Sequence, residues 1–182
     1  ASIDPVEFVR VHVSEGGVSP VSVKNMLDSR EDLLGSFRER QAARYSKIDA
    51  AQAELARQVA AGARESGAKV ETVFLQGMRI QPCTACDACR KKLKKDCIIK
   101  DDMRALYPRI KAADGIVIAS PIYWFTVSAQ TKLFMDRWYA LGGDGGYDLA
   151  GKKFGVVLAY ADADPFASGA VNALRTFQDA FN

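Results

Sequence analysis

Four cysteines lie close together in this sequence, and the chain has no others. They are Cys83, Cys86, Cys89 and Cys97. A cubane iron–sulfur cluster needs four thiolates that converge on one small object, and closely spaced cysteines on a looping backbone can supply them. The spacing predicts a [4Fe–4S] cluster, while a zinc ion and unligated or redox-active thiols remain as alternatives.

Composition and length narrow the class of protein. The chain has 182 residues, which predicts one domain large enough to bury a core, and no apolar run approaches the roughly 18 residues of a membrane span. Its 25 basic and 22 acidic residues give a net charge of only +3, so nucleic-acid binding is not expected. The clustered cysteines and the lack of an apolar leader at the start argue against a disulfide framework and favour a reducing, cytoplasmic location.

One segment between the third and fourth cysteines is strongly basic. Residues 90–95 read Arg-Lys-Lys-Leu-Lys-Lys, which places five cations in six positions. Such a run is often a solvated loop. It can also offset the negative charge of a thiolate cluster, or attract an acidic electron-transfer partner or a nucleotide phosphate. Both interpretations stay open at this point.

From residue 46 onward, helix and strand patterns alternate. A capping box at Ser46 predicts a helix that ends at Gly67. Strands are predicted at 69–75, 115–119 and 154–160, and further helices at 101–113, 128–138 and 170–181. The continuous apolar run at 115–119 is typical of a parallel strand buried on both faces. These patterns predict an α/β domain over 46–182, with an open, mainly parallel sheet, helices on both faces and a cysteine loop at 82–100.

Residues 1–45 do not follow this alternation. Residues 6–13 alternate apolar and polar side chains and predict a possible edge strand, while residues 25–44 are highly charged. His12 is the single histidine in the chain, which makes a histidine-based catalytic centre improbable and favours a surface position. Neither a P-loop nor a GxGxxG motif occurs.

An ordered series of motifs carries a resemblance to a known family. The series is Pro82 to Cys97, Asp101-Asp102-Met103, Ala113-Asp114-Gly115-Ile116-Val117, Ser120-Pro121-Ile122-Tyr123-Trp124, Lys132 and Asp136-Arg137. It resembles the flavodoxin-like NAD(P)H-dependent FMN reductases, and in particular their iron–sulfur flavoprotein branch. The resemblance covers about residues 46–182.

The resemblance implies a flavodoxin-like fold with FMN at the carboxyl ends of the strands, and an assembly of dimers or tetramers. The flavin-binding turn of the family corresponds to Pro121, Ile122, Tyr123 and Trp124. A second flavin loop corresponds to Tyr160, Asp162 and Ser168. Open α/β sheets bind ligands at this edge, although the aromatic residues at 123–125 could instead be core residues at a strand end.

The loop that binds the FMN phosphate in this family would fall within residues 1–45, the region that does not follow the helix–strand alternation. The nearest match to the family's Gly-Ser-Pro-Arg loop is Gly35-Ser36-Phe37-Arg38, followed at a longer interval by Ser46 at the expected helix start. Ser36 and Arg38 are equally compatible with ordinary surface positions. The first and last strands of the family are absent or atypical here, so an edge of the sheet is left open, and residues 6–13 could fill it.

Together these observations predict an FMN-dependent oxidoreductase that takes electrons from NAD(P)H and passes them on through a [4Fe–4S] cluster to an acceptor that the sequence does not identify. Hydride transfer to a flavin needs no acid–base residue, so no catalytic residue is nominated. Two other functions stay open. One is an electron carrier that docks to protein partners through the basic segment, and the other is a flavin-free thiol or zinc module on the same scaffold.

Overall fold

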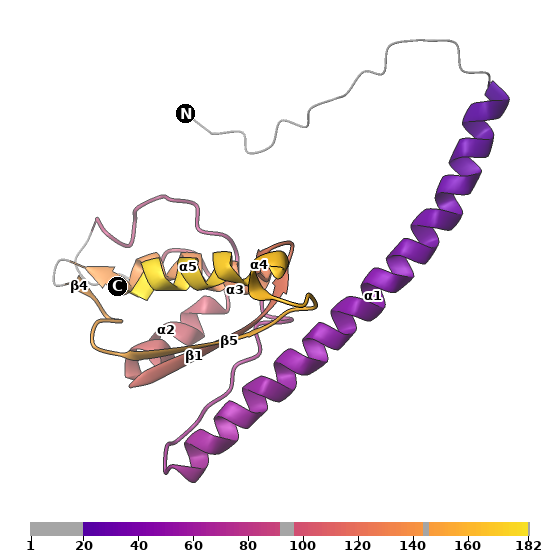
Figure 1. Cartoon of the computed structure of the whole chain (residues 1–182). Coiled ribbons are helices and arrows are strands. Elements are labelled where there is room, and N and C mark those ends of the chain that lie inside the picture. The colour runs from indigo at the N-terminus through magenta and orange to yellow at the C-terminus, as the bar shows by residue number, and fades with distance from the viewer. Residues whose placement is uncertain (1–19, 92–96, 144–145, 182) are drawn as a thin grey trace. The chain divides into compact units, whose positions relative to one another are not determined.

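The computed structural model describes residues 20–91, 97–143 and 146–181 (Figure 1). The chain divides into two units, Ala1–Ala43 and Arg44–Asn182, and each is described by itself. The possible edge strand at 6–13 and His12 lie outside the described residues.

The first described element is the long helix α1, Pro20–Glu65, which begins in the first unit and ends in the second. The predicted end is confirmed: Gly67 has φ +88°, and the amide of Ala68 donates to the carbonyl of Ala63 over 3.0 Å. Neither α1 nor any other described helix combines the length and apolarity that crossing a membrane requires.

The predicted start of this helix at Ser46 is wrong. Pro20 stands in the first turn of α1, where its missing N–H costs nothing, and residues 21–45 contain one glycine, no further proline and many Arg, Glu, Leu and Ala residues that favour helix. The helix therefore continues through Ser46. It also runs through Gly35–Arg38, so the loop expected at that motif is absent from the described backbone.

The central sheet has three strands in the order β2-β1-β5, namely β1 Gly115–Tyr123, β2 Thr126–Val127 and β5 Lys153–Ala159. The predicted parallel pairing is confirmed, since β1 and β5 run parallel from Gly115↔Lys153 to Pro121↔Ala159. β2 pairs antiparallel with the last two residues of β1. The sheet is mixed, with helices on both sides, and a separate hairpin joins β3 Gly142–Gly143 to β4 Gly146–Tyr147.

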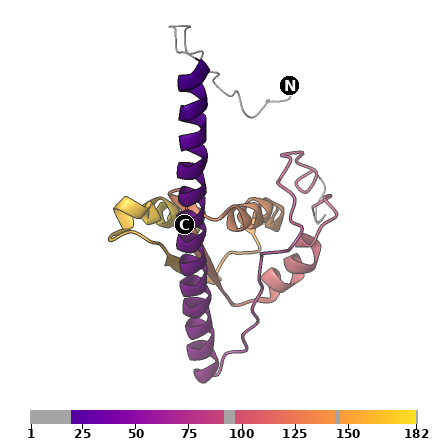
Figure 2. The same ribbon diagram turned by 90° about the vertical axis from the view of Figure 1, so that its right-hand side faces the viewer.

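Five short helical elements accompany these strands within the described residues: α2 Met103–Ala112, α3 Ala129–Asp136, the 3-10 helix η1 Arg137–Leu141, α4 Pro165–Ser168 and α5 Ala170–Phe181. Ser128 caps α3 as predicted, because its hydroxyl accepts from the amide of Thr131 over 3.3 Å. Figure 2 shows α5 (yellow) and α3 (orange) above the strands.

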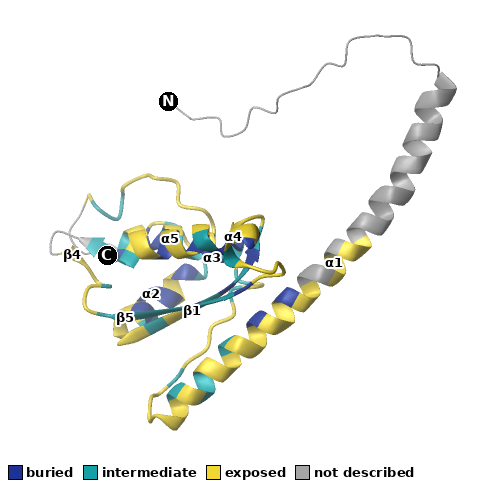
Figure 3. Ribbon diagram, in the orientation of Figure 1, coloured by how far each residue is buried: buried dark blue, intermediate teal, exposed yellow. Residues whose placement is uncertain are grey.

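The core lies on one face of the sheet. Ile118 and Ile122 of β1 pack there with Met103 and Leu106 of α2 and with Phe177 of α5, and all five are buried (Figure 3). The opposite face is less covered, since Val117 remains 52% exposed. The expectation that β1 is buried on both faces therefore holds for one face only among the described residues.

The strand predicted at 69–75 is wrong. The segment has no regular secondary structure, and Phe74 is 74% exposed. Among the described residues, β1 pairs with β5 along one edge and only with β2 at Ile122 and Tyr123 along the other. A strand forms only where a neighbour accepts its hydrogen bonds, so residues 69–75 stay unpaired in spite of their apolar, β-branched sequence.

Candidate functional site

The carboxyl end of β1 carries a turn with an unusual backbone. Pro121, Ile122 and Tyr123 are the last residues of the strand, and the turn itself falls on Trp124 and Phe125, which have φ +46° and +68°. Bulky residues rarely adopt such left-handed conformations, which are strained and cluster at functional sites. Trp124 is 86% exposed. The turn therefore presents an indole at the strand end, where open α/β sheets bind ligands.

Several contacts hold this turn in place. The Ser120 hydroxyl accepts from the amide of Ser128 over 3.0 Å, and the Asn172 side chain donates to the carbonyl of Phe125 over 3.1 Å. Gly169 has φ +78° and packs so closely that a Cβ there would lie 2.5 Å from the Phe125 Cα. The strained turn is thus supported by its own strand and by the start of α5.

Gly169→Ala is expected to lower the free energy of unfolding by roughly 2–4 kcal/mol, because the new Cβ would both clash with Phe125 and occupy a left-handed backbone. Gly151→Ala is a matched control: Gly151 has φ +79° but nothing within 4 Å of an added Cβ, and about 1 kcal/mol is expected there. Urea unfolding of both variants provides the measurement. Equal losses of unfolding free energy in the two variants would mean that the close contact between Gly169 and Phe125 contributes nothing to stability.

The second loop predicted to contact flavin follows β5. Because β1 and β5 are parallel, Tyr160 and Asp162 come at the same edge of the sheet as Trp124, and both are exposed. Ser168 differs from these two residues because it is buried. Its hydroxyl donates to the carbonyl of Pro165 over 3.1 Å and accepts from the amide of Ala170 over 3.1 Å. Its side chain serves the α4–α5 junction. Ile122 is likewise buried, which leaves only its backbone available at the edge.

The second part of α1 adds residues that sequence reasoning missed. The Tyr123 hydroxyl donates a hydrogen bond to the Asp49 carboxylate. Gln52, one helical turn further, is buried, yet neither atom of its amide has a hydrogen-bond partner among the described residues. A buried amide without partners is costly. The available signal was a glutamine four residues after Ile48, on the apolar face of the helix.

A buried ion pair fixes both ends of the cysteine loop. The Asp101 carboxylate accepts from the amides of Gln81 over 2.8 Å and Met103 over 3.1 Å. Arg137 pairs with Asp101, and its Nη1 also donates to the carbonyl of Gln81 over 2.9 Å. The two charged side chains are 0% and 1% exposed. The residues before Cys83 and after Cys97 are therefore held together by one carboxylate and one guanidinium.

The same contacts set the ionisation of Asp101. Burial alone would raise the pKa of this carboxyl, but the hydrogen bonds from Arg137 and from the Gln81 amide outweigh burial, and the pKa lies below its ordinary value. Burial also raises the pKa of Tyr107, whose hydroxyl donates to the carbonyl of Arg137 over 3.1 Å. At neutral pH the carboxylate is thus ionised and the phenol is neutral.

The free energy of unfolding should depend on pH through the protonation of Asp101. Its folded-state pKa is lowered, so its stabilising effect is present above the unfolded pKa of about 3.9 and is lost as the pH falls through that value toward the folded-state pKa. We expect the unfolding free energy of Asp101→Asn to fall less than that of the wild type between roughly pH 6 and pH 3. Urea titrations at several pH values test this. Parallel curves for the two proteins would contradict it.

The four cysteines differ in exposure. Cys83 and Cys86 are exposed, Cys89 is half-buried and Cys97 is buried. The amide of Ala88 and then the Thr84 hydroxyl lower the pKa of Cys86. Burial raises the pKa of Cys89, and the neighbouring Cys97 and Cys86 act in the same direction. The four thiols therefore do not share one environment.

The four cysteines are chemically suited to ligate an iron–sulfur cluster, because all four are free thiols on one loop whose ends are anchored. Within the described ranges, no three or more histidine, cysteine or carboxylate side chains are already gathered as a metal site. Binding a cluster would therefore require the thiols to come closer together than they are in these described ranges. Of the predicted phosphate residues, Ser46 is an exposed residue of α1, while Ser36 and Arg38 belong to the first unit, which is described by itself.

Comparison with known proteins agrees with these features. A family model described as NADPH-dependent FMN reductase matches residues 47–180. The chain is 44% identical over 95 residues to an iron–sulfur flavoprotein of Archaeoglobus fulgidus, which covers 52% of this chain and 47% of that protein. It is 37% identical over 118 residues to one of Methanocaldococcus jannaschii, covering 65% and 58%, and 43% identical over 75 residues to one of Methanosarcina thermophila, covering 41% and 38%.

The chain spans about two fifths to three fifths of the length of these curated relatives. No solved structure matches it. The family model nevertheless covers well over half of the chain, from α1 to the end of α5, and includes both the strained aromatic turn and the cysteine loop. This chain therefore belongs to the NADPH-dependent FMN reductase family.

Proposed function

We propose that this protein is an FMN-dependent oxidoreductase whose flavin binds at the carboxyl edge of β1 and β5. The observation that carries the proposal is the strained turn at Trp124 and Phe125, in a chain of the FMN reductase family. The backbone at Pro121, Ile122 and Tyr123 would hold the flavin edge. Trp124 and Tyr160 would supply aromatic surface next to the ring.

Two polar features fit a flavin at this edge. The orphaned Gln52 amide offers a donor and an acceptor, and flavin carries both kinds of partner on its pyrimidine ring. The exposed Asp162 lies on the loop that follows β5. Bound FMN would supply acceptance of a hydride from a reduced nicotinamide and release of electrons one at a time. The protein's part is to bind and orient the flavin, which is why no acid–base residue is proposed.

The cysteine loop is proposed to hold a [4Fe–4S] cluster on Cys83, Cys86, Cys89 and Cys97. Support comes from the thiol-only donor set and from the relatives, which are named iron–sulfur flavoproteins. The buried Asp101–Arg137 pair keeps the ends of the loop together, which limits how far the four thiols can separate. The cluster would pass electrons from the flavin to an acceptor.

Further parts of the proposal concern the rest of the molecule. Ser36, Arg38 and Ser46 remain the predicted contacts of the FMN phosphate, and NAD(P)H is the proposed transient donor. The proposed working form is a homodimer or homotetramer. The proposed environment is the reducing cytoplasm, because thiolate clusters survive where thiols stay reduced.

The test is the visible absorption spectrum of protein purified without oxygen, recorded before and after addition of NADPH or NADH, together with iron and zinc analysis. A two-banded flavin spectrum above a broad brown shoulder, with both bleached by reduced nicotinamide, is expected. A flavin spectrum without iron would leave a flavin reductase with spare thiols. Zinc without iron or flavin would favour the thiol or zinc module, and a colourless protein that does not bind added FMN would refute the proposal.

A further inference from the structure

Arg90, the first cation of the basic segment, is only partly exposed and packs against two tyrosine rings. The guanidinium carbon of Arg90 lies 4.4 Å from the ring centroid of Tyr139 and 5.0 Å from that of Tyr147. Its Nη2 also donates to the Tyr147 hydroxyl over 2.7 Å. A planar guanidinium can stack on aromatic rings and donate at its edge at the same time, which a lysine ammonium cannot do. Arg90 thus joins the cysteine loop to η1 and to the β3–β4 hairpin.

The surroundings of Arg90 are shaped to receive it. A Cβ on Gly142 would lie 2.4 Å from both terminal guanidinium nitrogens, so a larger residue there would force the end of the Arg90 side chain to shift. The Tyr139 hydroxyl donates to the Asp87 carboxylate over 2.8 Å, which orients the ring that Arg90 covers. The amide of Arg90 in turn donates to the carbonyl of Asp87 over 3.0 Å. Two residues of the cysteine loop, Asp87 and Arg90, therefore contact the same tyrosine.

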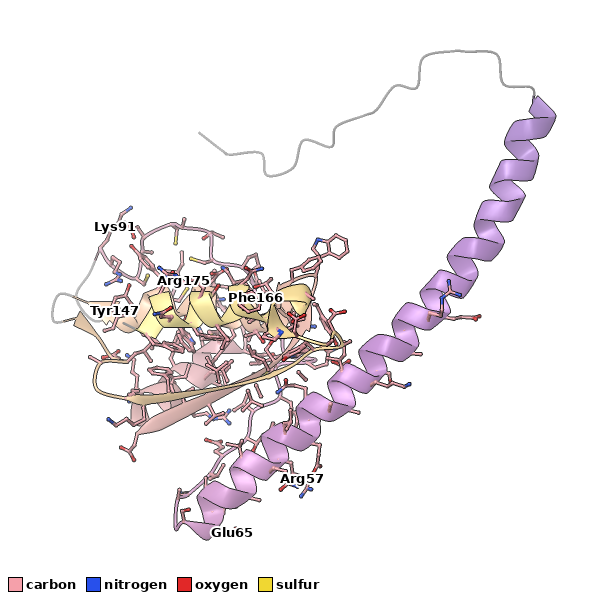
Figure 4. The ribbon with its side chains drawn as sticks, in the orientation of Figure 1. Arg57, Glu65, Lys91, Tyr147, Phe166 and Arg175 are labelled. Atoms are coloured by element: carbon pink, nitrogen blue, oxygen red, sulfur yellow. The ribbon has the colours of Figure 1, made fainter. Side chains whose placement is uncertain are left out.

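Lys91 provides a contrast within the same basic segment. It is exposed, and Figure 4 shows Lys91 and Tyr147 at the same end of the second unit. Charge alone does not separate the two neighbours, since both carry one positive charge. What separates them is contact: Arg90 lies between two tyrosine rings, and its Nε is buried without a hydrogen-bond partner among the described residues. A guanidinium held in this way contributes through the fixed geometry of its contacts as well as through its charge.

We infer that Arg90 is a positioning residue that holds the preceding thiol, Cys89, against η1 and the β3–β4 hairpin. This deepens the proposed cluster site and rests on it for its purpose, because Cys89 directly precedes Arg90 in the chain and is one of the four proposed ligands. The contacts themselves exist in the protein without any metal. Their effect on Cys89 can therefore be measured independently of the cluster.

The first test is the rate at which iodoacetamide alkylates each cysteine in metal-free, reduced protein, followed by peptide mass spectrometry. Arg90→Ala is expected to raise the rate at Cys89 about tenfold relative to the exposed Cys83, which corresponds to about 1.4 kcal/mol, within the range of a partly exposed cation–π contact together with one hydrogen bond. Cys97 is buried by the core and should change little. Lys91→Ala, the matched control, should leave all rates unchanged.

Conservative variants separate positioning from general destabilisation. Arg90→Lys keeps the charge but not the planar stack, so it should behave like Arg90→Ala. Tyr139→Phe keeps the ring and loses only the hydrogen bond to Asp87, so most protection of Cys89 should remain, whereas Tyr139→Leu removes one of the two rings that contact Arg90 and should lower the protection. Equal rates at Cys89 in the Arg90→Ala and Lys91→Ala proteins would overturn the inference, and so would full protection in Arg90→Lys.

The second test uses the iron-loaded protein and follows transfer of iron to a chelator. Arg90→Ala should lose iron about tenfold faster than Lys91→Ala, because one ligand arm is less well held. Equal loss rates would also count against the inference. If the wild type never holds iron, the proposed cluster fails, while the alkylation rates still decide the role of Arg90.

Discussion

Replacing Arg137 by methionine is expected to lower the free energy of unfolding by about 3–5 kcal/mol. The substitution would leave the Asp101 carboxylate buried without its counter-charge and would remove the donor to the Gln81 carbonyl. Both side chains of the pair are almost completely shielded from water, so solvent cannot replace the lost contacts. Chemical denaturation by urea, followed by circular dichroism, gives the value.

A surface ion pair of the same chain provides the control. Arg175 and Asp179 are 3.0 Å apart on α5, with side chains 70% and 57% exposed, and Arg175→Met should cost less than about 1 kcal/mol. The double variant Asp101→Asn with Arg137→Met removes both charges and should be less destabilised than the sum of the single losses. A loss in Arg137→Met no larger than that in Arg175→Met would show that the buried pair does not fix the loop.

Replacing Cys86 by serine is expected to reduce the iron content of anaerobically purified protein to background while FMN stays bound. A serine hydroxyl is essentially un-ionised near neutral pH and is a much poorer ligand for cluster iron than a thiolate. The flavin site is proposed at the carboxyl ends of β1 and β5, and Cys86 lies on the separate loop that Asp101 and Arg137 anchor. Iron analysis and the flavin absorption bands of the same sample decide the matter.

Cys97→Ser is an independent check, because Cys97 comes from the far end of the loop and is buried where Cys86 is exposed. Loss of iron in both variants is expected. Wild-type iron content in both would exclude these thiols as ligands. Loss of flavin together with iron would mean that the two sites depend on each other structurally, which would contradict their assignment to separate loops.

Much of the fold after residue 66 was predictable because local patterns and long-range packing agree there. The apolar run of β1, the Ser128 cap and the apolar face of α2 each predicted their element, and the parallel pairing of β1 with β5 followed from the alternation of strands and helices. The failed strand prediction has a physical cause. Residues 69–75 have strand-like side chains, but a strand also needs a hydrogen-bonding neighbour, which local sequence does not reveal.

By itself, the sequence determined the cysteine set, the resemblance to the family and the strand end at which a ligand is expected. Only the tertiary structure decided how these residues are held. Asp101 and Arg137 are 36 positions apart, and Arg90 and Tyr147 are 57 apart, so nothing local indicated that they meet. The left-handed turn at Trp124 and Phe125 was equally hidden, because residue types at a turn do not fix its φ angles when distant groups such as Gly169 and Asn172 support it.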